Sequence, residues 1–320
     1  MSTLNLGPTY GATLIGILIS SVLYGFTSFQ TYLYFIRFGK NDRRLLKCMV
    51  AFIWVLETLH EFLVSHYLYW NLIVNYGNPS ALVATTNVDD VTTGVTALIT
   101  LVVQCFYSRR IWIMSNKNWY LPTFTFVLSV AHFGFEIAVM VLTFLLPQYT
   151  DFERVAKPYF TTGLALAAAT DITIAASISY YLTINRSGIK STNAILNKII
   201  THTVSSGMLT SITDIVILIC FLTMPNNLVF LFFYDFINNF YANSLLAMLN
   251  SRESLRAIVD ADTSGSIALS EFQVAPGVPH KLDKNWIGSH GSDMRSTFET
   301  SMTRTGRSAT LYPTVELQEA

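Results

Sequence analysis

Hydrophobic residues fill the first 250 positions in seven long stretches, with short polar segments between them. Each stretch is long enough to cross about 30 Å of hydrocarbon as a helix that rises about 1.5 Å per residue. The stretches are continuous rather than alternating, which favours helices over a membrane β-barrel. We therefore predict an all-α fold, a seven-transmembrane-helix bundle within residues 1–257. The expected spans are residues 12–36, 48–71, 91–114, 120–146, 159–184, 199–224 and 228–249.

Positive charge falls on alternate connecting segments. The first, third and fifth segments and the residues just after the last span carry 13 Lys or Arg, whereas the segments between them carry two, Arg154 and Lys157. Because Lys and Arg near span ends are retained on the cytoplasmic side, this asymmetry predicts an N-terminus outside and a cytoplasmic C-terminus. The expected location is an integral, multi-pass position in a membrane, with the plasma membrane favoured.

The composition changes after the last span. Residues 258–320 are rich in Ser, Thr, Gly and Pro, and nine of the twenty positions at 291–310 are Ser or Thr. Such a segment can bury little apolar surface on folding, so we expect a mostly disordered cytoplasmic tail. The Ser and Thr residues fit both a phosphorylated tail and a solvated tail without that role.

The overall composition narrows the possible functions. Charged residues make up 12% of the chain, compared with about 25% in a typical soluble domain. The basic residues lie on short segments beside the spans, where the lipid bilayer is the expected partner, and nothing supports nucleic-acid binding. No Walker, HExxH, GxSxG or CxxC pattern appears, so we expect no enzymatic activity.

Several short motifs occur together along the first 257 residues. They include Gly11-Ala-Thr-Leu-Ile-Gly16, Asn75-Tyr-Gly-Asn-Pro79, Arg109-Arg-Ile-Trp112, Gly207-Met-Leu-Thr-Ser211, Met224-Pro-Asn-Asn227 and Leu249-Asn-Ser-Arg252. In combination they resemble a family of fungal, basidiomycete-type seven-helix multi-pass membrane proteins of unknown function, over about residues 10–257. The resemblance implies a fold and a membrane location. It implies no activity and no functional residues.

The candidate chemistry lies in ionisable residues inside the spans. An isolated charge at the bilayer centre costs several kcal/mol, so such residues need a proton, a hydrogen-bond partner or a counter-ion. Two groups have helical spacing, Glu57, His60 and Glu61 at i, i+3 and i+4, and His132 and Glu136 at i and i+4. Acid–histidine pairs of this kind are typical proton carriers. The six acids are Glu57, Glu61, Glu136, Asp171, Asp214 and Asp235.

Two interpretations of these residues stay open. They are either interhelical hydrogen-bond partners that hold the bundle together, or the lining of a polar cavity or proton relay. Most of the acids fall in the middle or outer half of their spans, so a cavity would be expected to open outward.

Two classes of function follow from these features. Receptor-like sensing or signalling, with an unknown ligand or cytoplasmic partner, fits the N-out seven-helix topology and the Ser/Thr-rich tail. The alternative is a proton- or cation-coupled transporter that uses the intramembrane carboxylates. No internal repeat of the kind common in carriers is visible, which favours the receptor-like interpretation.

A calcium-loop pattern lies in the tail at residues 260–271. Asp260, Asp262 and Ser264 occupy loop positions 1, 3 and 5, and Glu271 occupies the bidentate position 12. The helix that should follow is broken early by Pro276, and no second loop pairs with this one. The pattern therefore fits either a weak calcium site or a chance match. Calcium is the one cofactor that the sequence suggests.

Overall fold

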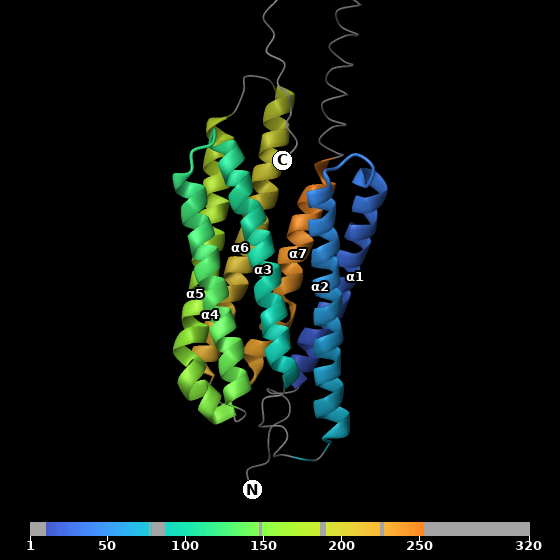
Figure 1. Cartoon of the computed structure of the whole chain (residues 1–320), viewed down its shortest axis with the longest axis vertical. Helices are drawn as coiled ribbons and strands as arrows, with labels where there is room; N and C mark the ends of the chain where they lie inside the picture. The colour runs from blue at the N-terminus through green and yellow to red at the C-terminus, as the bar shows by residue number, and fades with distance from the viewer. Residues whose placement is uncertain are drawn as a thin grey trace, which may run out of the picture. The chain divides into compact units, whose positions relative to one another are not determined.

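Helices form at all seven hydrophobic stretches. The structure is a computed structural model that describes residues 11–76, 78, 87–146, 149–185, 190–224 and 227–252, and all of its regular secondary structure in these ranges is helical. The helices are α1 (Ala12–Phe38), α2 (Arg44–Tyr69), α3 (Asn87–Met114), α4 (Tyr120–Leu145), α5 (Tyr149–Ile184), α6 (Lys190–Thr223) and α7 (Val229–Asn250), and a π-helical turn, η2 (Trp70–Val74), continues α2 (Figure 1).

Six of the seven helices are long and apolar enough to cross a membrane, and α7 is not among them. The prediction of helical membrane spans is therefore confirmed for α1 to α6. For α7 only the helix itself is confirmed, because Asp235 and several asparagines lower its hydrophobicity. Length and composition weigh every polar residue equally, whether its side chain faces lipid or a neighbouring helix.

Successive helices run in alternate directions and pack beside one another (Figure 1). Contacts between helices that are not successive centre on two of them, α3 and α7. α3 also contacts α5 and α7, and α7 contacts α1, α2, α3 and α6. The polar helix α7 is therefore surrounded by other helices on several sides.

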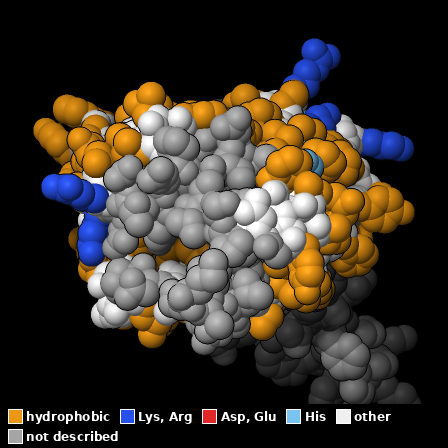
Figure 2. All heavy atoms as spheres, turned by 90° about the horizontal axis from the view of Figure 1, so that it is seen from below, with side chains coloured by type: hydrophobic (Ala, Val, Ile, Leu, Met, Phe, Trp, Pro, Cys, Tyr) orange, Lys and Arg blue, Asp and Glu red, His pale blue; other side chains and the backbone are white. Residues whose placement is uncertain are grey.

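The helices bury polar side chains and expose apolar ones. In α1, Thr13, Ser20 and Thr27 are fully buried, whereas Ile15 and Val22 are more than half exposed. Figure 2, a view along the bundle, shows hydrophobic side chains around its periphery. A helix of a water-soluble protein would place these residues the other way round, because it hides its apolar stripe. This polarity is what a lipid environment requires.

α5 begins well before its predicted span. Pro158, which directly precedes the predicted span, lies inside the helix. The ring removes one backbone N–H, and the carbonyl left without that donor belongs to Arg154, near the start of the helix, where polar surroundings are close. Hydrophobicity marks only the part of a helix that faces hydrocarbon, so it missed this polar first section.

The predicted asymmetry of charge appears as one basic end of the bundle. The α1–α2 turn, the α3–α4 turn and the end of α7 all lie at the top of Figure 1. We call this the basic end, and the side chains that define it are Arg37, Lys40, Arg43, Arg44, Lys47, Arg109, Arg110, Lys117 and Arg252. Arg154 and Lys157 lie near the start of α5, toward the opposite end.

A salt bridge joins the first and last helices at the basic end. Arg252 donates from one guanidinium nitrogen to Asp42 Oδ2 at 2.5 Å and from the other to Oδ1 at 3.3 Å. The Tyr34 hydroxyl donates to the same carboxylate at 2.8 Å. The guanidinium also lies over the Phe38 ring, 4.5 Å from its centroid. We call these four residues the Asp42 clasp, and it fixes the end of α7 to the α1–α2 turn.

Candidate functional site

The six acids divide between two regions of the bundle, and α7 takes part in both. In the first region, α7 meets α1 and α2. Asn238 donates to Glu57 Oε2 at 3.1 Å, and Asn239 donates to the Ser20 hydroxyl at 2.8 Å. Ser20 donates in turn to Glu61 Oε2 at 3.0 Å. Two neighbouring asparagines of α7 thus connect to two different helices.

His60 does not pair with the acids beside it. Glu57 and His60 are both almost fully buried, as their shared helical face predicted. Neither imidazole nitrogen, however, has a hydrogen-bond partner among the described residues. Glu57 is occupied by Asn238, and Glu61 accepts from Ser20 and also from Ser21. The three residues therefore share a face without forming a hydrogen-bonded relay.

The second region lies between α4, α6 and α7. His132 Nε2 and Glu136 Oε1 are 3.6 Å apart, so this predicted pair is present as an i, i+4 contact. The Tyr234 hydroxyl donates to Glu136 Oε2 at 3.1 Å, and the Tyr241 hydroxyl lies 3.5 Å from Asp214 Oδ2. Two tyrosines of α7 thus reach carboxylates on two other helices.

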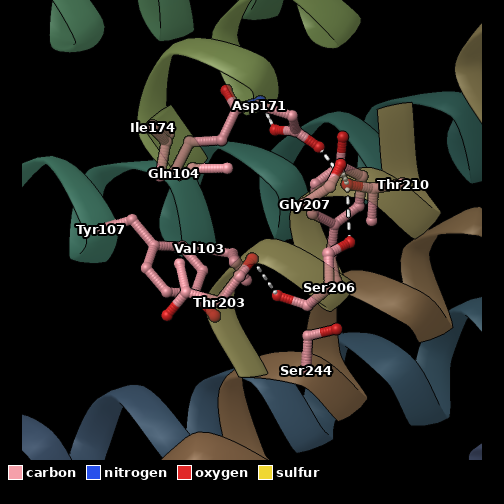
Figure 3. A pocket seen from close by; sticks show the side chains of 12 residues that line it. Val103, Gln104, Tyr107, Asp171, Ile174, Thr203, Ser206, Gly207, Thr210 and Ser244 are labelled. Carbon is pink, nitrogen blue, oxygen red and sulfur yellow. Dashed lines mark hydrogen bonds between the residues drawn. The ribbon is translucent and has the colours of Figure 1, made fainter. Parts of the chain in front are cut away.

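Asp171 of α5 is held by α3 and α6. Gln104 donates its amide to Oδ1 at 3.0 Å, and the Thr210 hydroxyl donates to Oδ2 (Figure 3). Gly207 allows α6 to come this close to α5, because a Cβ at that position would lie 2.9 Å from the Cβ of Ala175. The glycine thus brings Thr210 within reach of the acid.

Asp235 of α7 also lies close to α1. Its side chain is buried, and a Cβ added to Gly16 would lie 3.2 Å from Oδ2. The same Cβ would lie 2.6 Å from the Phe232 carbonyl oxygen. Gly16 therefore lets α1 and α7 approach closely, and Asp235 packs into this contact.

A small cavity lies beside Asp171. It is only partly enclosed, and it has room for about one water molecule. Of its lining residues, Tyr107, Thr203 and Ser244 all lie on the side of Asp171 toward the basic end, since α3, α5 and α7 end there (Figure 3). The expectation that a cavity would open outward stays a prediction. The lining residues are Val103, Gln104, Tyr107, Asp171, Ile174, Ala175, Thr203, Ser206, Gly207, Thr210, Tyr241 and Ser244.

The described residues contain no cluster of three or more His, Cys, Asp or Glu that could hold a metal ion. The calcium-loop pattern, with Asp260, Asp262, Ser264 and Glu271, lies outside the described residues.

Some hydrogen-bond partners of the acids could be anticipated and others were missed. Thr210, Tyr234, Asn238 and Asn239 were foreseeable as polar residues in apolar spans. Gln104 was missed, although it is a lone amide between Val103 and Cys105 in a helix that is otherwise apolar there. A search for every uncharged polar side chain in mid-span would have found it.

The six apolar helices and their buried polar interior define a multi-pass integral membrane protein. The model of a family described as a family of unknown function (DUF6534) matches residues 167–254. The match covers the second half of α5 and all of α6 and α7, and therefore includes Asp171, Asp214 and Asp235. No curated protein and no solved structure matches the chain. The predicted resemblance to a family of unknown function is thus supported over residues 167–254, and its extension to the earlier helices and the fungal origin stay predictions.

Proposed function

We propose that this protein is a receptor-like sensing protein of seven membrane spans, in which α7 transmits a change in helix packing to the cytoplasmic tail. The observation that carries the proposal is the set of hydrogen bonds made by α7. Its Tyr234, Asn238 and Tyr241 each meet a buried carboxylate of a different helix, α4, α2 and α6. Such bonds can be exchanged when helices shift, and α7 leads directly into the tail.

The burial of α7 supports its assignment as the seventh span. Its 22 residues reach about 33 Å as a helix, which matches the hydrocarbon thickness. Its Asn238 and Asn239 are fully buried against neighbouring helices. A helix with polar residues facing protein rather than lipid needs less overall hydrophobicity to lie in a membrane. The basic end supports a cytoplasmic C-terminus and an N-terminus outside.

The transporter interpretation is the second candidate, and the buried acids favour it. The small size of the cavity beside Asp171 argues against transport of an organic substrate and in that respect favours sensing. A space for about one water molecule holds no organic substrate, since sites for such ligands have volumes of about 300–1,000 Å³. A proton or small ion is the one kind of cargo that this geometry accommodates.

Transport can be measured directly in sealed vesicles. The full chain and its Asp171→Asn variant would be reconstituted separately, with a pH-sensitive dye inside for an imposed proton gradient and a sodium-sensitive dye for a sodium gradient. Sensing predicts that both proteins dissipate the gradient no faster than protein-free vesicles. Faster dissipation by the wild type that the Asp171→Asn variant loses would establish the transporter alternative.

The tail provides the positive test. A chain ending at residue 262 keeps all the helices of the described residues and loses residues 263–320. In the native cell, sensing predicts that this truncation reproduces the transcriptional changes caused by deleting the gene. A truncated protein that reaches the membrane and restores the wild-type profile would contradict the proposal, because the bundle alone would then perform the function.

A further inference from the structure

We propose that the α1–α2 turn binds one phospholipid whose headgroup carries more than one phosphate group. The binding surface is made by residues 40–47, at the basic end of the bundle (Figure 1). The inference goes beyond the receptor-like function and does not depend on it, because a bundle that signals and a bundle that moves ions could each hold such a lipid.

Four positive side chains lie within eight residues of this turn, Lys40, Arg43, Arg44 and Lys47. The first three are exposed, and none of them forms an ion pair with an acid among the described residues. Lys47 follows Arg44 by about one helical turn, and its ammonium group donates to the Gly39 carbonyl at 3.1 Å. This bond holds the fourth charge against the turn, where the other three lie.

The one acid of the turn is not available to balance these cations. Asp42 is buried, and its two carboxylate oxygens accept hydrogen bonds from Arg252, with a further bond from the Tyr34 hydroxyl. The first turn of α2 contains no acidic residue. The Asp42 clasp thus directs the negative charge inward and leaves the exposed charges of the turn all positive.

Neighbouring side chains place this positive surface at the level of lipid headgroups. Leu45, directly after Arg44, is 73% exposed, as expected where acyl chains begin. At the same end of the bundle, the exposed rings of Trp119 and Tyr120 stack on each other at the start of α4. Trp and Tyr are enriched where the hydrocarbon meets the headgroups, and long basic side chains reach from this depth into the headgroup layer. The nearest source of anions for the turn is therefore the membrane itself.

The number of cations selects the type of headgroup. A headgroup with one net negative charge, such as phosphatidylserine, can balance one of the four, whereas a headgroup with several phosphates can contact several of them. Arginine also binds phosphate through two parallel hydrogen bonds, and Arg43 and Arg44 are adjacent. Clusters of Lys and Arg directly beside a membrane span are typical binding sites for such lipids on the cytoplasmic side, which the basic end is predicted to face.

Native mass spectrometry of the full chain in neutral detergent tests the proposal, because it counts bound lipids one by one. The chain would be titrated with dioctanoyl phosphatidylinositol bisphosphate, with dioctanoyl phosphatidylserine and with inositol trisphosphate, which has no acyl chains. A detergent micelle has no inner and outer face, so the result does not depend on the orientation of the protein. We expect one bisphosphate lipid to bind per chain, at least about tenfold more tightly than either of the other two ligands.

A matched pair of double variants locates the site. Arg43→Gln with Arg44→Gln should weaken binding about 25-fold, since each Lys or Arg close to an anionic headgroup contributes a factor of about five. Arg109→Gln with Lys117→Gln removes the same charge from exposed positions at the α3–α4 turn of the same end, and it should change the affinity by less than about twofold. If the first double variant does not fold, Lys40→Gln provides the same test with an expected loss of about fivefold.

Four results would overturn the proposal. Absence of binding would exclude the site, and equal affinity for the two lipids or equal losses in the two double variants would show only a general attraction of the basic end for anionic lipid. Inositol trisphosphate that binds as tightly as the lipid would assign the turn to a soluble anion. A chain ending at residue 262 that binds the lipid at least about tenfold more tightly than the full chain would identify the tail as the occupant.

Discussion

Replacing Arg252 by alanine should loosen the last helix from the first two. The substitution removes two hydrogen bonds from the Asp42 carboxylate and the guanidinium that covers the Phe38 ring. Asp42 remains buried, with the Tyr34 hydroxyl as its one remaining donor in the clasp. The loss therefore includes an uncompensated negative charge as well as the broken contacts.

The structure sets the size of this effect. Removing one partner of a buried ion pair typically lowers the free energy of unfolding by about 3–5 kcal/mol. The Arg252 side chain is 23% exposed and Asp42 keeps its bond from Tyr34, so we expect a smaller loss of about 2–3 kcal/mol. In a bundle of this size that loss lowers the melting midpoint by about 4–12 °C. The melting midpoint of Arg252→Lys should lie between those of the wild type and Arg252→Ala, because lysine keeps the charge but loses the bidentate geometry.

A double-mutant cycle with Asp42→Asn measures the clasp itself. Melting of the wild type, Arg252→Ala, Asp42→Asn and the double variant should give a coupling free energy of at least about 1 kcal/mol. Arg109→Ala removes an exposed arginine at the same end and should leave the midpoint within about 2 °C of the wild type. Effects of the two clasp substitutions that simply add, within about 0.5 kcal/mol, would refute the reasoning.

Two further predictions concern separate features, the close contact between α1 and α7 and the calcium-loop pattern of the tail. Gly16→Ala should lower the free energy of unfolding by about 1–3 kcal/mol, because its new methyl group would collide with the Phe232 carbonyl. Gly25→Ala is the control, since a Cβ at that position has open space around it. In the same melting assay it should be neutral or slightly stabilising. A peptide of residues 251–282 should gain helix by circular dichroism with a calcium dissociation constant of about 10⁻⁴–10⁻³ M, and Glu271→Gln should abolish the gain. An unchanged spectrum at millimolar calcium would identify the loop pattern as a chance match.

The helices could be predicted well from the sequence, and their environment less well. Hydrophobic length located α1 to α6, since lipid imposes one simple requirement on every residue of a span. It could not establish α7 as a span, because Asn238 and Asn239 count against it although both face protein. Whether a polar residue faces lipid or a neighbouring helix depends on the rotation of that helix, which composition does not record.

The acids of the candidate site could be predicted from the sequence, but only some of their hydrogen-bond partners could. Charge in an apolar span is conspicuous, so Glu57, Glu136 and Asp171 stood out at once. Helical spacing grouped His60 with Glu57, yet the structure gives that acid to Asn238 instead. A partner on another helix is set by tertiary packing, whereas spacing along one helix describes only neighbours within it. The Asp42 clasp was missed for the same reason, since Arg252 is 210 positions from Asp42 in the chain.

The position of α7 in the chain has a consequence for biosynthesis. It is the last of the described helices to leave the ribosome, and until it arrives the carboxylates of α2, α4 and α6 lack Asn238, Tyr234 and Tyr241. A nascent chain of six spans therefore holds buried acids without these donors, in a membrane where such groups are unfavourable. Packing of α7 against the other helices completes their hydrogen bonds, and Arg252 then joins the end of α7 to Asp42. Translation that stops short of α7 leaves an incomplete bundle of the kind that cellular quality control removes.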